Sequence, residues 1–596
     1  MPRLPPSAAT GLGADGQIVS TAFDDCYFSR HDGLGETRAV FLGGTGLPQA
    51  WAGRQRFVIG EIGFGTGLNV LATWDLWRKT RPQGAVLHII SVEGFLLDAE
   101  TAGQALQAWP ELAPLSEALR KRWPRRVYGP QRICFEDDGL CLTLLIGPCA
   151  QVLAEMDFQA DAWFLDGFSP AKNPDMWSQD VFDQVARLSA RGARLGTYSV
   201  AARVRDGLTR AGFLVEKVQG FGHKRHRLEG VFVGEVRSMD APKPKSALIL
   251  GGGIAGAALV AAFARRGVET IMCDDDPCGR TKASHNPVAI LMPRLDRGDT
   301  REARFFRAAY VMACDQYGSM AADAFDPCGV LECEKDGQKP GRLADLANDP
   351  PLPPDMLDVA DGQALLHLTG GVVFPDAARN ALTKSAVRHP VTIAKLLRQD
   401  GHWCASDGEG KEIARADVAI IAAGYQSRDW FDLTRNLGAK PGQISLAEAE
   451  GLELALSGGS YCAPFGDKIV FGATYEAFAP NAPIPPASAD GHSHNLAALH
   501  RLAPDIAARI DDKRLFGRTS VRATTPDHMP IAGPLSDEPD QEGIYVLSGL
   551  GSRGFTTAFL CAEVIASHAC QEPSPVTRDI ERALAPNRFK ARAPRA

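Results

Sequence analysis

The chain has 596 residues, more than a single hydrophobic core organises, so at least two domains are expected. A net charge of −7 excludes a globally basic nucleic-acid-binding protein, and any contact with nucleic acid must therefore come from a local basic patch. The thirteen cysteines form no C-x-x-C pair, which argues against a zinc ribbon or a disulfide scaffold and favours reduced thiols in the cytoplasm.

The first informative stretch joins an apolar strand, Phe57 to Ile62, to a helix that begins near Leu68. Between them lies the pattern E-x-G-x-G-x-G, made by Glu61, Gly63, Gly65 and Gly67. Such a turn leaves room for a ligand on the backbone and opens many methyltransferases that bind S-adenosylmethionine. The next strand, 86–93, ends at Glu93, an acid placed to take the ribose hydroxyls. A dinucleotide site and a plain tight turn are the alternatives.

A third strand of this region, 161–166, ends at Asp166. In an open α/β sheet, ligands bind beyond the carboxyl ends of the strands, so Asp166 is placed to reach a substrate. The alternative is that Asp166 caps a helix or forms a turn.

A basic loop follows at 220–227, with the sequence GFGHKRHR. Lys224, Arg225 and Arg227 are the candidates for contacts with nucleic-acid phosphates, which would make affinity fall steeply with salt. A second basic cluster comprises Lys121, Arg122, Arg125 and Arg126. The alternative for the loop is an ordinary solvated turn.

After a polar, proline-bearing stretch, 238–246, a new strand–turn–helix–strand unit begins at Ala247 and ends at Asp274. Its G-x-G-x-x-G pattern consists of Gly251, Gly253 and Gly256. These glycines allow a tight turn and a close approach to a pyrophosphate, and the acid at the second strand's end suits a ribose. The unit therefore predicts a dinucleotide site. A membrane span is rejected because glycines crowd its start and Arg265 and Arg266 end it.

Four motifs together resemble one family closely: FDDCYFSRHDGLGETRAVFL (23–42), EIGFGTGLN (61–69), DGFSPAKNPDMW (166–177) and GFGHKR (220–225). With the order of the two domains, they make the chain similar over essentially its whole length to the family of bifunctional tRNA 5-methylaminomethyl-2-thiouridine biosynthesis proteins. This resemblance implies an N-terminal S-adenosylmethionine-dependent methyltransferase fused to a C-terminal FAD-dependent oxidoreductase, both acting on the modified wobble uridine of tRNA.

The resemblance implies two doubly wound Rossmann-type α/β domains, the second with an added antiparallel substrate-binding sheet like that of glycine oxidase. The expected bounds are 1–237 for the methyltransferase, 238–246 for a linker and 247–596 for the oxidoreductase. Residues 417–424 are expected to form a buried strand near FAD, and 440–445 and 471–475 to form strands of the added sheet. Segment 370–380 departs from the family after its start, so no substrate contact is expected from it.

The resemblance also implies roles for individual residues. Arg522 matches the position where amine oxidases of this type hold a substrate carboxylate, a task suited to a planar guanidinium. The alternative is a surface salt bridge. His285 stands where the family usually has glycine, and it is either a catalytic base or a hydrogen-bonded structural histidine. Gly549, Gly551 and Gly554 form a second glycine-rich strand-to-helix turn, whose helix is expected to direct its N-terminus at FAD. The remaining expected contacts are Asp275 with FAD, Arg553 with FAD or substrate, and Lys172 with substrate or tRNA.

The implied chemistry has two steps. FAD removes a hydride equivalent beside the amine of a carboxymethylaminomethyl group, and hydrolysis leaves an aminomethyl group and glyoxylate. The aminomethyl nitrogen then attacks the S-adenosylmethionine methyl after giving its proton to Asp166. Competing interpretations are a flavin amine oxidase for free small amino acids fused to a small-molecule methyltransferase, and a non-catalytic RNA-binding scaffold. A cytoplasmic chain without metal or membrane association is expected, with a monomer as one option for the oligomeric state.

Overall fold

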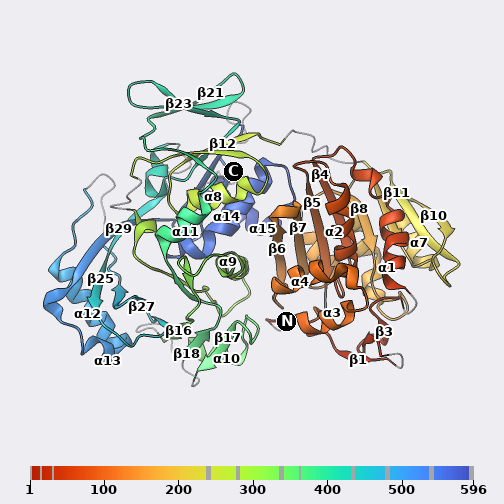
Figure 1. Cartoon of the computed structure of the whole chain (residues 1–596), viewed down its shortest axis with the longest axis horizontal. Coiled ribbons are helices and arrows are strands. Elements are labelled where there is room, and N and C mark those ends of the chain that lie inside the picture. Colours follow the sequence, from red (N-terminus) through yellow and green to blue (C-terminus); the bar gives the residue numbers. More distant parts are fainter. Residues whose placement is uncertain are drawn as a thin grey trace, which may run out of the picture. The chain divides into compact units, whose positions relative to one another are not determined.

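The computed structural model describes residues 3–13, 16–29, 32–235, 243–276, 282–334, 341–360, 364–430, 436–476, 483–535 and 542–589. The chain forms two compact units (Figure 1). The first comprises Met1–Ala241 with Gln571–Arg578, and the second comprises Pro242–Cys570 with Asp579–Ala596. The bounds expected from the sequence did not assign 571–578 to the first unit, and most of the expected linker lies outside the described residues.

The first unit is built on an eight-stranded sheet with the order β10-β11-β9-β8-β4-β5-β7-β6. Its strands are β4 (Arg56–Ile62), β5 (Val86–Glu93), β6 (Gly129–Phe135), β7 (Leu140–Ile146), β8 (Ala160–Leu165), β9 (Ser189–Thr197), β10 (Phe213–Gln219) and β11 (His226–Phe232). The central strands from β9 to β7 are parallel, whereas β6, β10 and β11 join antiparallel. The chain crosses between β4 and β8 to reach the other half of the sheet, so the loops after these strands border the ligand crevice.

Alternation along the strands places apolar side chains on both faces of this sheet. Phe57 and Ile59 of β4 join one hydrophobic core, whereas Val58 joins the other. Helices cover both faces: α2 (Leu68–Thr80) and α4 (Ala113–Lys121) on the first, and α5 (Cys149–Glu155), α6 (Gln179–Arg187) and α7 (Ala202–Arg210) on the second. The doubly wound arrangement predicted for this unit is therefore confirmed.

Short elements before β4 complete the first unit. They are β1 (Thr10–Leu12), β2 (Ile18–Ser20), β3 (Asp25–Cys26), α1 (Gly33–Glu36) and the π-helical η1 (Thr37–Gly43), and α3 (Ala99–Leu106) follows β5. Asp32 caps α1 by accepting a hydrogen bond from the Gly35 amide at 2.7 Å. This cap satisfies a backbone amide in the first turn of α1, the helix that carries Glu36.

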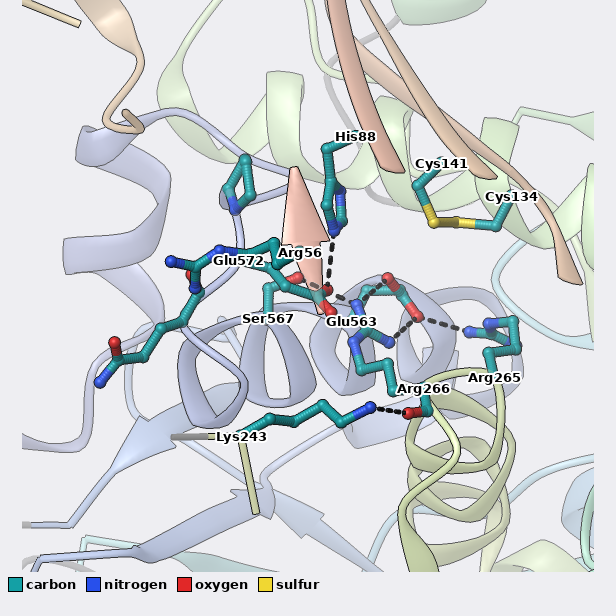
Figure 2. Close-up of polar contacts among 12 residues, drawn as sticks. Arg56, His88, Cys134, Cys141, Lys243, Arg265, Arg266, Glu563, Ser567 and Glu572 are labelled. Carbon is teal, nitrogen blue, oxygen red and sulfur yellow. Dashed lines mark hydrogen bonds and ion pairs between the residues drawn. A yellow bond between two sulfur atoms is a disulfide. The ribbon is translucent and has the colours of Figure 1, made fainter. Parts of the chain in front are cut away.

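Residues 571–578 return to the first sheet late in the chain. Glu572 Oε2 lies 3.5 Å from Nε2 of His88 on β5, and both side chains are almost fully buried (Figure 2). Arg132 of β6 donates a hydrogen bond to the Pro573 carbonyl at 2.6 Å. A fragment that stops at residue 237 therefore lacks part of this unit.

One pair of cysteines contradicts the expectation of reduced thiols. Cys134 and Cys141 face each other in the antiparallel register of β6 and β7 and form a disulfide (Figure 2). The prediction was wrong for this pair because it considered spacing along the chain, whereas a hairpin brings residues seven positions apart into direct opposition.

The second unit begins with a six-stranded sheet of order β20-β13-β12-β24-β31-β30. Its strands are β12 (Ser246–Leu250), β13 (Glu269–Cys273), β20 (Val387–His389), β24 (Val418–Ile421), β30 (Ile531–Pro534) and β31 (Ile544–Ser548). All neighbours are parallel except β30 and β31. Helices α8 (Ile254–Ala264), α9 (Arg301–Gly318) and α14 (Gly554–Ala569) lie together beside it (Figure 1).

The predicted additional sheet is present, with eight strands in the order β17-β18-β16-β26-β27-β28-β25-β29. Neighbouring strands pair antiparallel as expected, except β16 and β26, which are parallel. Its strands are β16 (Val330–Cys333), β17 (Leu357–Ala360), β18 (Ala364–His367), β25 (Gly438–Glu448), β26 (Ala455–Ser457), β27 (Tyr461–Phe465), β28 (Lys468–Gly472) and β29 (Phe516–Thr524). Strand β28 covers Lys468–Gly472, so the strand expected over 471–475 begins and ends three residues earlier than predicted. Helix α12 (Ala489–Leu502) covers one face through Leu499.

The remaining described elements of the second unit are short. They are β14 (Ala289–Leu291), β15 (Phe325–Asp326), β19 (Gly371–Val373), β21 (Lys395–Gln399), β22 (His402–Ser406), β23 (Glu412–Ala416), α10 (Arg342–Asn348), α11 (Pro375–Leu382), α13 (Pro504–Ala507) and α15 (Arg578–Leu584), which starts in the first unit. Across the described ranges, no helix is both long and apolar enough to cross a membrane. The same ranges contain no group of three or more metal-ligating side chains.

A buried ion pair joins α14 to the end of α8. Glu563 Oε2 lies 3.0 Å from Nη2 of Arg266, and both side chains are 3% exposed (Figure 2). Arg265 pairs with the same carboxylate. The single Glu563 carboxylate thus bridges two guanidinium groups that follow the end of α8.

Replacing Glu563 by glutamine is expected to lower the free energy of unfolding by about 3 kcal/mol, because it removes the charged partner from a buried, hydrogen-bonded ion pair. Urea unfolding of the full-length chain measures the change. Glu269→Gln, at an exposed position on β13, is the matched control. Equal midpoints for the two variants would contradict the assignment.

Candidate active sites

The first candidate site lies at the carboxyl ends of β4 and β8. Gly63, Gly65 and Gly67 have φ angles of 95°, 54° and 81°, a region that side-chain-bearing residues rarely adopt. A Cβ on Gly63 would lie 1.9 Å from the Asp166 carbonyl oxygen, so this glycine allows the two loops to touch. The cradle fits a ligand that rests on the backbone, as expected for S-adenosylmethionine.

Two acids flank this glycine turn. Glu93, at the end of β5, accepts hydrogen bonds from the amides of Gly65 at 2.9 Å and Phe95 at 2.8 Å. Glu61 is fully buried and accepts a hydrogen bond from Ser91 at 2.5 Å. Burial raises the pKa of Glu61 to about 8, so Glu61 is mainly protonated at neutral pH. Glu93 thus contacts the glycine turn directly, whereas the Glu61 side chain is enclosed in the protein interior.

Asp166 follows β8 and belongs to a hydrogen-bonded chain that the sequence did not reveal. Asn69 of α2 donates to Asp166 Oδ2 at 2.7 Å, and Thr37 donates to Asn69 Oδ1 at 2.8 Å. Burial raises the pKa of Asp166 to about 7, although the hydrogen bond from Asn69 partly opposes this shift by lowering the pKa. Glu36 raises the pKa further and Lys224 lowers it. A carboxyl that titrates near neutrality is suited to accept a proton during catalysis.

Lys224 lies in this site rather than free on the surface. Its Nζ is 2.7 Å from Glu36 Oε1 and 4.2 Å from the ring centre of Tyr198. Tyr198 in turn donates from its hydroxyl to the Gly167 carbonyl at 2.6 Å. The basic loop therefore brings the Lys224 ammonium group close to Asp166. The phosphate-binding role expected for this loop did not predict that placement.

The other expected tRNA contacts differ in their surroundings. Arg225 is exposed. Arg227 is paired with Glu229 at 2.6 Å, and Lys172 is paired with Asp24 at 3.2 Å. In the second cluster, Lys121 pairs with Glu117, Arg122 stacks on Phe135, and Arg126 donates to the Pro5 carbonyl. Arg225 is thus the most available of these side chains for a phosphate.

The second candidate site is a cavity of about 1170 Å³ within the second unit. Both glycine turns line it, through Gly251, Gly252 and Gly253 after β12 and through Gly549, Gly551 and Gly554, the last of which begins α14. A Cβ on Gly251 would lie 2.5 Å from the Ala422 carbonyl, and one on Gly256 would lie 1.9 Å from the Gly251 carbonyl. The first turn is therefore closed by backbone contacts that only glycine permits.

Asp274 lies at the end of β13, as expected, but its carboxylate is already engaged. One oxygen accepts a hydrogen bond from the Gly252 amide at 2.7 Å, and the other pairs with Lys282. Lys282 also lies 3.1 Å from Asp275. Asp274, Asp275 and Lys282 all line the cavity, so the three charges form one wall of the expected FAD site.

His285 does not line this cavity. Arg379 of α11 donates to His285 Nδ1 at 2.8 Å and to the Gly252 carbonyl at 2.8 Å. Burial and then Arg379 lower the pKa of His285 to about 4, so the ring is neutral and carries its proton on Nε2. This geometry favours the structural role over a catalytic base.

Arg522 of β29 reaches the cavity with unused hydrogen-bonding capacity. Its side chain is largely buried, and its guanidinium carbon lies 4.7 Å from the ring centre of Tyr475. Among the described residues, Nη1 of Arg522 has no hydrogen-bond partner. A buried cationic donor without a partner fits an anionic group of a ligand.

Arg553 lines the same cavity before α14. Its Nη1 donates to the Pro293 carbonyl at 3.0 Å. Burial lowers the pKa of Arg553, Glu332 opposes this shift, and Arg294 and Arg342 add to it. The Arg553 guanidinium is already hydrogen-bonded to the backbone. We therefore expect it to contribute positive potential to the cavity rather than to bind a ligand directly.

Sequence reasoning missed several residues of both sites. Glu36, Asn69 and Tyr198 belong to the first, and Lys282 and Tyr475 to the second. The only sequence signal for Glu36 was its place in the motif at 23–42, which carried no role.

Known proteins match both units. Residues 110–232 match the family described as S-adenosyl-L-methionine-dependent methyltransferase, and residues 246–568 match the FAD dependent oxidoreductase family. A protein of Caulobacter sp. (strain K31), described as "tRNA 5-methylaminomethyl-2-thiouridine biosynthesis bifunctional protein MnmC", is 38% identical over 597 residues, with 97% of each chain covered. A protein of the same description from Caulobacter vibrioides (strain ATCC 19089 / CIP 103742 / CB 15) is 39% identical, with 96% of each chain covered.

Among solved structures, glycine oxidase from Geobacillus kaustophilus is similar with a TM-score of 0.47 and 15% identity, covering 59% of this chain and all of that chain. The two family matches and the Caulobacter relatives confirm the predicted pairing of a methyltransferase that uses S-adenosylmethionine with an oxidoreductase that uses FAD.

Proposed function

The chain belongs to the family of bifunctional tRNA 5-methylaminomethyl-2-thiouridine biosynthesis proteins, and we propose that its two units act in succession on one wobble uridine of tRNA. The observation that carries this proposal is the complementarity of the two sites. One cavity offers an unpartnered guanidinium to a carboxylate, and the other site offers a carboxyl that titrates near neutrality to an amine. The aminomethyl product of the oxidase step in the second unit is thus the substrate that suits the Asp166 site of the first unit.

In the second unit, the substrate is a carboxymethylaminomethyl group. Arg522 holds its carboxylate, and the Tyr475 ring packs against the guanidinium. The two glycine turns and the wall formed by Asp274, Asp275 and Lys282 would hold FAD, which would supply the oxidising chemistry at the carbon beside the amine. Water then cleaves the oxidised C–N bond, which releases glyoxylate and leaves an aminomethyl group on the uridine.

In the first unit, the aminomethyl nitrogen loses a proton to Asp166 and attacks the sulfonium methyl group. The S–CH₃ bond breaks as the N–CH₃ bond forms, and S-adenosylhomocysteine leaves. Asn69 orients the Asp166 carboxylate through the 2.7 Å hydrogen bond. The glycine turn and Glu93 would hold S-adenosylmethionine beside this carboxylate.

The substrate in both steps is tRNA, so the protein acts in the cytoplasm, where tRNA is modified. Arg225 is the side chain best placed to add phosphate contacts in the first unit, since its neighbours Lys224 and Arg227 are paired with Glu36 and Glu229.

Nucleoside analysis of tRNA from a strain that lacks the protein tests the proposal. Carboxymethylaminomethyl uridine is expected to accumulate and the methylaminomethyl form to disappear. Re-expression of the wild-type chain restores the product, which serves as the control. An unchanged nucleoside profile, with turnover of free glycine or sarcosine by the purified chain, would instead favour an oxidase for free amino acids.

A further inference from the structure

The hairpin turn between β10 and β11 places a lysine in a site built for an ammonium group. Lys224 Nζ lies 2.7 Å from Glu36 Oε1 and 4.2 Å from the centre of the Tyr198 ring. The Glu36 side chain is only 12% exposed, whereas that of Lys224 is 44% exposed. A carboxylate combined with an aromatic face is an arrangement by which proteins bind alkylammonium ligands.

This cation site adjoins the proposed base. Tyr198 is fixed by its hydrogen bond to the carbonyl of Gly167, the residue after Asp166. On the other side, Thr37 follows Glu36 and is linked through Asn69 to the Asp166 carboxylate. The Glu36 carboxylate and the Tyr198 ring are thus both anchored to the segments that hold Asp166.

The lysine can leave this site without rearranging the sheet. The turn is closed by a hydrogen bond from the Gly220 amide to the Arg225 carbonyl at 3.0 Å, independently of the Lys224 side chain. Lys224 itself carries its ammonium on a flexible four-carbon stem, so side-chain rotation alone can move the charge into solvent. Glu36 has no such freedom, because burial holds it in place.

We propose that Glu36 and the face of Tyr198 bind the substrate's aminomethyl group as an ammonium ion, and that Lys224 occupies this site in the free enzyme until the substrate displaces it. The proposal rests on the methyl-transfer function proposed above. The lysine keeps the buried Glu36 carboxylate compensated while no substrate is present. The bound ammonium is then adjacent to Asp166, which takes its proton before the methyl group is transferred.

The same site also determines the order in which the two reactions occur. The precursor that still carries its carboxymethyl group would bring a carboxylate next to Glu36 and Asp166, and like charges at this distance repel. The aminomethyl product of the oxidase step has lost that carboxylate. The site therefore favours the group that the second unit delivers.

Steady-state methyl transfer to tRNA that carries aminomethyl uridine tests the displacement. At pH 8.5 and constant ionic strength, Lys224→Met is expected to lower KM about fivefold with little change in kcat, because an internal competitor has been removed. Glu36→Gln is expected to raise KM at least about tenfold, since a charge-assisted contact is lost. Lys217→Met, at an exposed position on β10, removes the same charge from the hairpin and is the control.

Methylammonium chloride serves as a probe of the site without tRNA contacts, against potassium chloride at equal ionic strength. It is expected to inhibit Lys224→Met more strongly than wild type and not to inhibit Glu36→Gln. If Glu36→Gln fails to bind S-adenosylmethionine, the comparison of Lys224→Met with wild type still tests whether Lys224 competes with an ammonium ligand for this site.

A raised KM for Lys224→Met would overturn the proposal and return Lys224 to phosphate binding. Equal inhibition of wild type and Lys224→Met by methylammonium would overturn it as well. If the methyl-transfer function itself were wrong, wild type would show no turnover of this tRNA at all, which is a separate result.

Discussion

Asp166→Asn is expected to bind S-adenosylmethionine like wild type and to transfer methyl groups roughly 100 to 10,000 times more slowly. The amide keeps the shape of the carboxyl, and its oxygen can still accept the hydrogen bond from Asn69. It cannot accept a proton from the substrate nitrogen. Single-turnover methyl transfer to aminomethyl tRNA measures the loss, and calorimetry measures cofactor affinity.

The control is Asp175→Asn, which changes an exposed carboxylate on the same loop. Its rate should match that of wild type. If Asp166→Asn retained full activity, Asp166 would be a structural residue of the loop, and the proton would have to leave by another route.

The pH dependence of methyl transfer gives Asp166 a second signature. Its raised pKa of about 7 means that the carboxyl is protonated, and unable to act as a base, below neutrality. The rate should therefore fall about tenfold per pH unit below pH 7 and level off above it. Glu61 has a pKa of about 8 but does not contact the substrate in this scheme, so its titration adds no second inflection to the pH–rate profile.

The parts of both sites that the sequence predicted are those encoded over short spacings. A strand, a glycine turn and an acid at the end of the next strand lie within a few dozen residues, and the structure has Gly63, Glu93, Gly251 and Asp274 at the predicted strand ends. Their positions follow from the backbone alone, because parallel strands end at the same edge of a sheet.

The parts that the sequence did not predict come from contacts between distant segments. Glu36 meets Lys224 across 188 positions, and Asn69 meets Asp166 across 97. No periodicity links such pairs. A basic run therefore suggested phosphate binding at Lys224, although the fold turns this side chain onto a buried carboxylate.

The oxidase site shows the same division. The glycines before α14 were predicted from the turn they form, and Arg522 came from a family resemblance, but its surroundings depend on the added sheet. Gly442 of β25 lies beneath the guanidinium, where a Cβ would come within 2.6 Å of Nη1. This packing directs Arg522 into the cavity, and only the pairing of β25 with β29 could reveal it.

Arg522→Met is accordingly expected to keep FAD bound and to lower kcat/KM for tRNA that carries carboxymethylaminomethyl uridine by about 100-fold or more. Truncating one partner of a buried charge-assisted pair costs about 2–5 kcal/mol, and here the substrate carboxylate is the other partner. Visible absorbance reports the bound flavin, and its bleaching by substrate tRNA without oxygen reports the reductive step.

Arg514→Met is the matched control, because it removes an exposed arginine whose nearest acid, Glu448, is 3.5 Å away. That variant should reduce its flavin at the wild-type rate. Rapid reduction in Arg522→Met would show that the carboxylate is held elsewhere, and the other guanidinium of the cavity, Arg553, would then be the group to test. A substrate that lacks the carboxylate should be oxidised equally slowly by wild type and Arg522→Met, since the clamp then has nothing to bind.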